Sequence, residues 1–232
     1  MAETPQDREE LLRLYQGLRV ADVRDAMDAL MLHHSGSMSP DIRPVWRTRA
    51  CGIARTARYL PYQGTIPTLS PQEYQEWAGW YYREVCPYPW MADIEEGDFC
   101  VIDQSGVDAG LMGSNNTLGG VRAGARGYVS NGGVRDTDEI ILQKIPFWSK
   151  CISKSMVQGW LQYHAKDVPV LVGGVVVHPG DVVVADGDGV IVVPRKHAAE
   201  AAMIAHEVLA TDKAGRRKLY EDLGMELDET VT

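Results

Sequence analysis

One stretch, residues 98–139, constrains the fold more than any other part of the chain. It opens with an apolar run at 99–102, continues through a glycine-rich loop, and then holds a Ser-Asn-Asn triplet at 114–116 followed by small residues. A second apolar run at 128–129 leads into the sequence Asn-Gly-Gly-Val-Arg-Asp at 131–136. This order predicts a strand, a loop, a helix, a second strand and a turn, as in an α/β sheet.

The helix expected after this loop offers a place for an anion. Ser and Asn are common at helix starts, and a helix N-terminus behind a flexible loop has free backbone N–H groups. The second strand ends at Arg135 and Asp136, and ligand crevices of α/β sheets lie at the carboxyl ends of strands. A guanidinium can hold a carboxylate with two hydrogen bonds, and a carboxylate can ligate a hard divalent cation. The stretch therefore predicts a small-ligand site.

Each of these residues also has a purely structural interpretation. Glu139 follows Asp136 by three positions, so Asp136 can be the cap of a helix that starts near Thr137. Arg135 can be a surface ion-pair partner, and the triplet at 114–116 can supply ordinary helix caps. Residue types and spacing alone leave both interpretations open.

Three parts of the chain resemble the RraA-like family, which includes the class II 4-hydroxy-4-methyl-2-oxoglutarate aldolases and the regulators of ribonuclease E activity. The family's active-site region is similar to GLMGSNN at 110–116 and NGGVRD at 131–136. Its opening helix and first strands are similar to VADVRDAMDAL at 20–30 and IRPVWRTRACGIARTARY at 42–59, and its second signature is similar to VGGVVVHPGDVVVADGDGVIVVP at 172–194. The resemblance implies an α/β fold with a swivelling β/β/α core, N-terminal helices and a long C-terminal helix.

The same resemblance implies a metal-dependent lyase for a 2-oxo dicarboxylic acid, pyruvate-like or β-keto. Retro-aldol cleavage and decarboxylation would both pass through pyruvate enolate. Arg135 would be catalytic, because it would contact the 2-oxo group and steady the enolate, and Asp136 would anchor Mg²⁺ or Mn²⁺, largely through water. The substrate carboxylate would be bound by the backbone N–H groups of Gly113, Ser114, Asn115 and Asn116.

The chain departs from the aldolase pattern at one position. The aldolases have an Asp directly after a Gly, twenty-one positions before the Arg, and it helps to hold metal-bound water; here that position is Ser114. Asp103 and Asp108 are candidates to replace it. In the aldolases a neighbouring subunit's C-terminal helix adds an acidic residue, for which Glu207 and Asp212 are candidates. The departure keeps a second interpretation open, a non-catalytic regulatory or binding protein of the ribonuclease-regulator type.

Charge and cysteine content bound the partners. A formal net charge of −9 argues against nucleic acid or an anionic membrane as the main partner. The chain has no apolar run of about 18 residues, and its acidic N-terminus does not resemble a secretory signal. Its four cysteines are widely spaced without CxxC pairing, which is typical of a reducing, cytoplasmic location. The expected partners are a small 2-oxo acid and, by resemblance, further copies of the chain in a homotrimer or a dimer of trimers.

The chain shows no internal repeat and no linker, so residues 1–232 are expected to form a single domain. The stretch at about 62–92 is rich in Trp and Tyr and looks like an insertion relative to the aldolases. Ser70-Pro71 followed by Glu73 predicts a helix start within it. The stretch is interpreted either as an aromatic plug under a subunit interface, which we favour, or as a lid or wall over the substrate pocket.

The remaining segments predict ordinary α/β elements. Thr4-Pro5 indicates the start of a first helix, and apolar residues spaced by three and four predict a second helix at 20–30. Arg55 and Arg58, in the expected strand at 49–60, are interpreted as surface charges. The last part of the chain is expected to hold β-branched runs at 169–177 and 182–194, the second of them interrupted by a turn at 186–189, and one long helix from His197 to about Leu223.

Overall fold

The computed structural model describes residues 7–232. The first helix, α1 (Arg8–Leu14), begins after Asp7, whose side chain caps its first turn. The helix start expected at Thr4-Pro5 lies outside the described residues.

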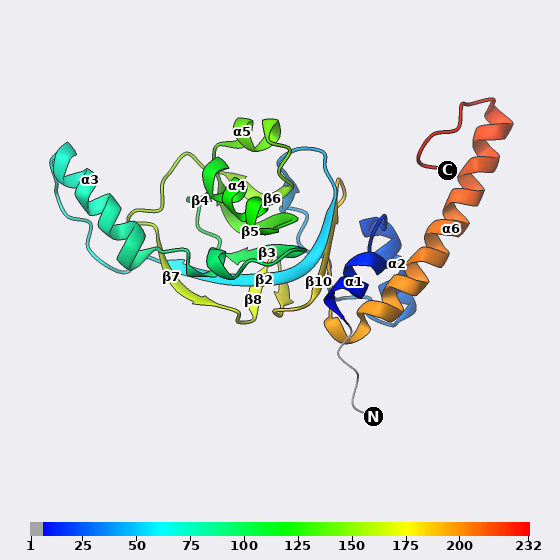
Figure 1. Cartoon of the computed structure of the whole chain (residues 1–232), viewed down its shortest axis with the longest axis horizontal. Coiled ribbons are helices and arrows are strands. Elements are labelled where there is room, and N and C mark those ends of the chain that lie inside the picture. Colours follow the sequence, from blue (N-terminus) through cyan, green and yellow to red (C-terminus); the bar gives the residue numbers. More distant parts are fainter. Residues whose placement is uncertain (1–6) are drawn as a thin grey trace.

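A nine-stranded sheet forms the body of the molecule (Figure 1). Its strands follow the order β1-β6-β5-β3-β2-β10-β11, with β4 paired to β5 and β7 paired to β2. β2 pairs parallel with β3, β3 with β5, and β5 with both β4 and β6, while the other pairs are antiparallel. The strands span Arg43–Pro44 (β1), Ala50–Pro61 (β2), Asp98–Asp103 (β3), Gly110–Met112 (β4), Gly127–Val134 (β5), Phe147–Ile152 (β6), Leu161–Lys166 (β7), Val182–Asp186 (β10) and Gly189–Val193 (β11).

The central stretch forms the strand, loop, helix and second strand that its sequence predicts, and adds one short strand, β4, that was not predicted. β3 leads into a loop and the short strand β4, then into α4 (Ser114–Ala123), β5 and α5 (Thr137–Leu142). Every residue of β3 is buried, as is usual for a parallel strand with both faces covered. β4 pairs in parallel with β5, so the ends of these two strands lie side by side. The polar residues at 114–116 and 135–136 directly follow these ends.

The two faces of the sheet are covered differently. One core cluster joins β3 and β5 to the aromatic segment at 81–94 and to α5. In a second core cluster, a small hairpin of β8 (Val170–Val172) and β9 (Val175–Val177) packs against Phe99 and Trp148. The single strand expected at 169–177 is therefore wrong, because Gly173 and Gly174, with φ of 57° and 79°, turn the chain back on itself.

Helices project from both ends of the sheet (Figure 1). At one end, α6 (Ala198–Leu223) packs its early alanines against α2 (Val20–Ala29), and its later turns extend away from the sheet. At the other end, α3 (Pro71–Trp80) projects outward, and its predicted start is confirmed by reciprocal hydrogen bonds between Ser70 and Glu73. The predicted α/β architecture, with helices at the N-terminus and a long helix at the C-terminus, is thus confirmed. Within residues 7–232 no helix is long and apolar enough to cross a bilayer.

Candidate functional site

A cavity of about 380 Å³ lies where β4 and β5 end and where α4 and α5 begin. Its volume falls in the range of roughly 300–1,000 Å³ that is usual for small-molecule sites. Every predicted site residue except Ser114 contributes to it, together with aromatic side chains from the segment before β3. The lining residues are Tyr82, Tyr88, Gly110, Leu111, Gly113, Asn115, Asn116, Arg135 and Asp136.

Arg135 and Asp136 reach the cavity because they directly follow β5. The N–H of Arg135 donates to the carbonyl of Met112 at 3.0 Å, so the chain stays paired with β4 to the rim of the cavity. One carboxylate oxygen of Asp136, Oδ2, accepts a hydrogen bond from the N–H of Ser114 at 3.3 Å. The other, Oδ1, lies 3.6 Å from Nε of Arg135. A guanidinium, a carboxylate and a helix start are thus brought together.

Asp136 does not cap its own helix with its side chain. Its backbone occupies the position before α5 in a left-handed conformation, with φ of 54°, and its side chain makes no capping hydrogen bond to that helix. The carboxylate instead contacts Ser114, the first residue of α4. The interpretation of Asp136 as an ordinary side-chain cap is therefore wrong. Its carboxylate is 38 % exposed and accessible to a ligand from solvent.

The triplet at 114–116 forms the first turn of α4, and Gly113 precedes it without a side-chain cap. First-turn N–H groups have no partner within a helix. That of Ser114 is used by Asp136, and the next two residues, Asn115 and Asn116, both line the cavity. The expected anion-binding helix start is thus part of the same cavity as Arg135.

Two glycines allow this close approach. A Cβ atom on Gly113 would overlap Oδ2 of Asp136, and a Cβ on Gly110 would lie 2.7 Å from Cδ of Arg135. The φ of Gly113 is −135°, which any residue can adopt. Glycine is therefore needed at 113 for space beside the carboxylate and not for its backbone conformation.

The variant Gly113→Ala tests this packing. We expect it to fold normally, because its backbone conformation suits alanine, but to displace the Asp136 carboxylate and lower any activity of the site on the order of 10-fold, since misplacement of a reacting group by about 1 Å can cost up to about 100-fold. The matched control is Gly119→Ala on the same helix, where the new Cβ would meet only Cε of Met91 at 3.8 Å. The control should gain about 0.5–1 kcal/mol in the free energy of unfolding and keep its activity. Equal activity of the two variants would contradict the role given to Gly113.

Tyr82 and Tyr88 form an aromatic part of the lining that the candidate residue set did not include. The Tyr88 hydroxyl donates to the carbonyl of Leu111 at 2.8 Å, and its ring centre lies 6.4 Å from that of Tyr82. Burial raises the pKa of Tyr88 well above its usual value, although a hydrogen bond from the Asn116 side chain acts in the opposite direction. The wall interpretation of the stretch at 62–92 thus describes these two tyrosines, and its interface role stays a prediction. The only signal in the sequence was the local density of aromatic residues.

The acidic residues at the cavity limit which metal ions the candidate site could hold. Asp136 is the only acidic residue in the cavity lining, and residues 7–232 contain no group of three or more His, Cys, Asp or Glu side chains able to hold a metal. A transition metal with three or four protein ligands therefore does not fit the described residues. Mg²⁺ or Mn²⁺ does fit, because such cations are held by one or two carboxylates together with water and substrate oxygens.

The other acidic candidates lie elsewhere. Asp103 accepts hydrogen bonds from Asn131 at 2.7 Å and from the N–H that follows it by two residues, and Asp108 lies 3.7 Å from the thiol of Cys151. Neither lines the cavity, so neither replaces the family's Asp at position 114. Glu207 and Asp212 belong to α6, at the opposite end of the sheet from the aromatic segment, and do not line it either.

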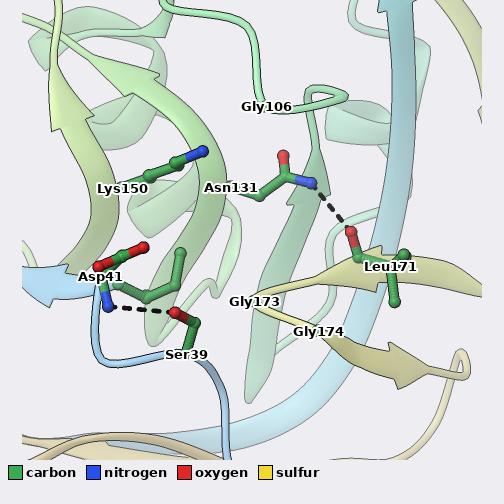
Figure 2. A pocket seen from close by; sticks show the side chains of 9 residues that line it. Ser39, Asp41, Gly106, Asn131, Lys150, Leu171, Gly173 and Gly174 are labelled. Atoms are coloured by element: carbon green, nitrogen blue, oxygen red, sulfur yellow. Dashed lines mark hydrogen bonds between the residues drawn. The ribbon is translucent and has the colours of Figure 1, made fainter.

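A second cavity, of about 250 Å³, lies on another part of the sheet (Figure 2). Lys150 and Asp41 lie on one side of it, and the turn at Gly173-Gly174 lies on the other. Asn131 also belongs to the lining, and its amide group is hydrogen-bonded within the protein. Its Nδ2 donates to the carbonyl of Leu171 at 2.9 Å, and its Oδ1 accepts from the N–H of residue 104 at 2.6 Å. None of the residues predicted for the site lines this second cavity.

Comparison with known proteins links this arrangement to one family. The family model described as "RraA-like: Aldolase/RraA" matches residues 20–192. A protein of Halalkalibacterium halodurans named "Putative 4-hydroxy-4-methyl-2-oxoglutarate aldolase" is 29 % identical over 136 residues, which cover 57 % of this chain and 63 % of that protein. A protein of the same name from Deinococcus radiodurans is 37 % identical over 98 residues, 41 % of this chain and 60 % of that protein. The matches thus span less than two thirds of the length of these curated relatives.

Solved structures share the whole architecture. An uncharacterized protein from Pseudomonas syringae pv. tomato has a TM-score of 0.75 and 26 % identity, and the match covers 99 % of this chain and 100 % of that one. RraAS2 from Streptomyces coelicolor, described as an unusual member of the RNase ES inhibitor RraA protein family, has a TM-score of 0.73 and 25 % identity, with 92 % and 99 % covered.

Proposed function

Because the chain belongs to the RraA-like family, we propose that the cavity beside Arg135 and Asp136 is the active site of a divalent-metal-dependent lyase that acts on a 2-oxo acid. The observation that carries this proposal is the convergence of three groups on one cavity, namely the start of α4, the Arg135 guanidinium and the Asp136 carboxylate. These groups can bind the substrate carboxylate, stabilise the pyruvate enolate and hold the cation, and the base that accepts the proton must come from elsewhere.

Substrate binding begins with the 2-oxo carboxylate. The N–H groups of Asn115 and Asn116 and the positive end of α4 attract this anion. The guanidinium of Arg135 then lies over the 2-oxo oxygen. This orientation leaves the distal part of the substrate along the remaining lining, which is formed by Tyr82, Tyr88 and Leu111.

Bond cleavage moves an electron pair toward Arg135. In the retro-aldol reaction the hydroxyl on C4 loses its proton, the C3–C4 bond breaks, and the pair enters the enolate of pyruvate, which then takes a proton on C3. In the decarboxylation of oxaloacetate the same bond breaks and carbon dioxide leaves. Either way negative charge grows on the 2-oxo oxygen, where the guanidinium of Arg135 stabilises it.

Asp136 is the proposed holder of Mg²⁺ or Mn²⁺. The Ser114 N–H fixes Oδ2, so the carboxylate is oriented, and the space beside Gly113 keeps that contact possible. When bound, the cation supplies Lewis-acid polarisation of the 2-oxo group.

The proton of the distal hydroxyl requires a base from outside this lining. Tyr88 stays a protonated phenol near neutral pH, because burial raises its pKa and its hydroxyl already donates to Leu111. The residues from 7 onward contribute no second carboxylate to the lining. We propose that a homotrimer or a dimer of trimers supplies an acidic residue from the α6 helix of a neighbouring copy, Glu207 or Asp212, which do not line the cavity of their own chain.

A second candidate function is a non-catalytic binding or regulatory protein. It is supported by Ser114, which stands where the aldolases have an acid, and by the single carboxylate of the lining. The same cavity would then bind an anion without turning it over.

Pyruvate release decides between the two functions. We expect the protein to release pyruvate from oxaloacetate, from 4-hydroxy-4-methyl-2-oxoglutarate or from related 4-hydroxy-2-oxo acids when Mg²⁺ or Mn²⁺ is present. Chelation should lower the rate by roughly 100-fold or more, because polarisation by a metal is worth several kcal/mol. Circular dichroism of the chelated protein controls for unfolding. A folded protein that turns over no 2-oxo acid with either metal is the binding protein.

A further inference from the structure

The lining of the candidate site has two unlike parts. Its charged and polar part consists of Arg135, Asp136 and the first turn of α4. Its aromatic and apolar part consists of Tyr82, Tyr88 and Leu111. A 2-oxo acid whose carboxylate and 2-oxo oxygen occupy the first part must place its distal group against the second.

The aromatic part offers little to a second carboxylate. Within the described part of the chain, Arg135 is the only positively charged residue of the lining, and the proposed reaction uses it at the 2-oxo group. The Tyr88 hydroxyl is already engaged with Leu111 at 2.8 Å. The hydroxyl of Tyr82 is a single neutral donor, and the faces of aromatic rings carry negative partial charge. A carboxylate that exchanges several water molecules for one such donor is destabilised.

The tyrosines also stand on a rigid support. Just before them in the sequence, the hydroxyl of the buried Tyr81 donates to the carbonyl of Leu161 at 2.7 Å. Just after them, Trp90 donates to the hydroxyl of Tyr59 at 2.8 Å, and that hydroxyl in turn donates to the carbonyl of Pro87 at 2.9 Å. A ligand that packs on this wall does not have to order it first, which favours binding.

We propose that this site selects 2-oxo acids with a single carboxylate and an apolar or aromatic distal group, and that Tyr82 is a residue that determines this specificity. The proposal rests on the proposed function for the placement of the 2-oxo end. It replaces the dicarboxylic substrate expected from family resemblance by a monocarboxylic one. Distal groups stack on or against the rings of Tyr82 and Tyr88, where aromatic pairs gain stability beyond the burial of area alone.

Calorimetric binding of two uncleavable acids tests the preference. Both 2-oxo-4-phenylbutanoate and 2-oxoglutarate carry the same 2-oxo carboxylate and lack a C4 hydroxyl, so they report binding without turnover. In the presence of Mg²⁺ we expect the phenyl acid to bind at least about 10-fold more tightly. Equal or tighter binding of 2-oxoglutarate, or no binding of either acid, overturns the proposal.

Variants of Tyr82 separate its ring from its hydroxyl. Tyr82→Ala should bring the ratio of the two dissociation constants close to one by weakening the phenyl acid alone, whereas Tyr82→Phe should keep the ratio. The matched control is Tyr74→Ala, which removes a partly exposed tyrosine of the same segment outside the cavity and should keep the wild-type ratio. Loss of 2-oxoglutarate binding in Tyr82→Phe would show that the hydroxyl binds a distal carboxylate and would overturn the proposal.

The binding test is independent of catalysis. If the preference for the phenyl acid is observed but no 4-hydroxy-2-oxo acid is cleaved, the lyase function fails and the specificity remains. If 4-hydroxy-4-methyl-2-oxoglutarate is cleaved and 2-oxoglutarate binds as tightly as the phenyl acid, the specificity fails and the lyase remains.

Discussion

Asp136→Ala is expected to lower metal-dependent pyruvate release roughly 100- to 1,000-fold, the cost of removing one well-placed electrostatic group from an active site. Among residues 7–232, Asp136 supplies the only carboxylate of the cavity lining, so no other carboxylate of that lining can replace it as a metal ligand. The fold should survive, because the side chain is 38 % exposed and accepts a hydrogen bond from the N–H of Ser114 that is only 3.3 Å long at a solvent-exposed position. Steady-state kinetics at several Mg²⁺ concentrations, with thermal unfolding of the same samples, measure both effects.

The backbone of Asp136 makes a second variant necessary. At φ of 54°, alanine costs about 1–2 kcal/mol, whereas asparagine tolerates this conformation. Asp136→Asn should therefore unfold at nearly the wild-type temperature and still lose the activity. Asp138→Asn, on an exposed residue of the first turn of α5, is the control and should behave as wild type. Wild-type kinetics in Asp136→Asn would remove this carboxylate from the mechanism.

Arg135→Ala is expected to lower the rate on the order of 100-fold, and Arg135→Lys by about 10-fold or more. Arg135 is one-third exposed and lies 3.6 Å from Asp136, an ion pair that contributes little to stability in such an environment. Its loss should therefore appear in catalysis and not in the unfolding temperature. A lysine keeps the charge but not the planar pair of donors, so the two variants separate charge from geometry.

Arg122→Lys is the matched control, because Arg122 is an exposed residue in the last turn of α4 and does not line the cavity. It should keep both rate and stability. If Arg135→Lys is as active as this control, the guanidinium does not contact the 2-oxo group as proposed.

The central elements were predictable from sequence because their signals are local. The apolar runs of β3 and β5, the glycine-rich loop and the polar triplet each indicate one element, and the parallel pairing of β4 with β5 then brings Gly113 and Arg135 together. The capping pair Ser70 and Glu73 likewise acts within one turn of α3.

The features that the sequence did not predict depend on contacts between residues far apart in the chain. Arg55 was expected to be a surface charge, but its side chain is 17 % exposed and pairs at 3.0 Å with the almost fully buried Asp98, a contact set by the register of β2 on β3. Tyr82 and Tyr88 line the cavity, and the residues that flank them in the sequence, Tyr81 and Trp90, are buried in the core. The spacing of residues along the sequence does not indicate such contacts. The hairpin at Gly173-Gly174, by contrast, had a recognisable signal, since glycine pairs favour tight turns between strands.

The left-handed backbone at position 136 also restricts how this protein can change over generations. Glycine, asparagine and aspartate are the residues that adopt this conformation at low cost, and an aspartate codon becomes either of the other two by one nucleotide substitution. Both replacements would keep the turn into α5 and remove the carboxylate. A descendant of this chain can therefore lose the carboxylate in a single step without first losing its fold.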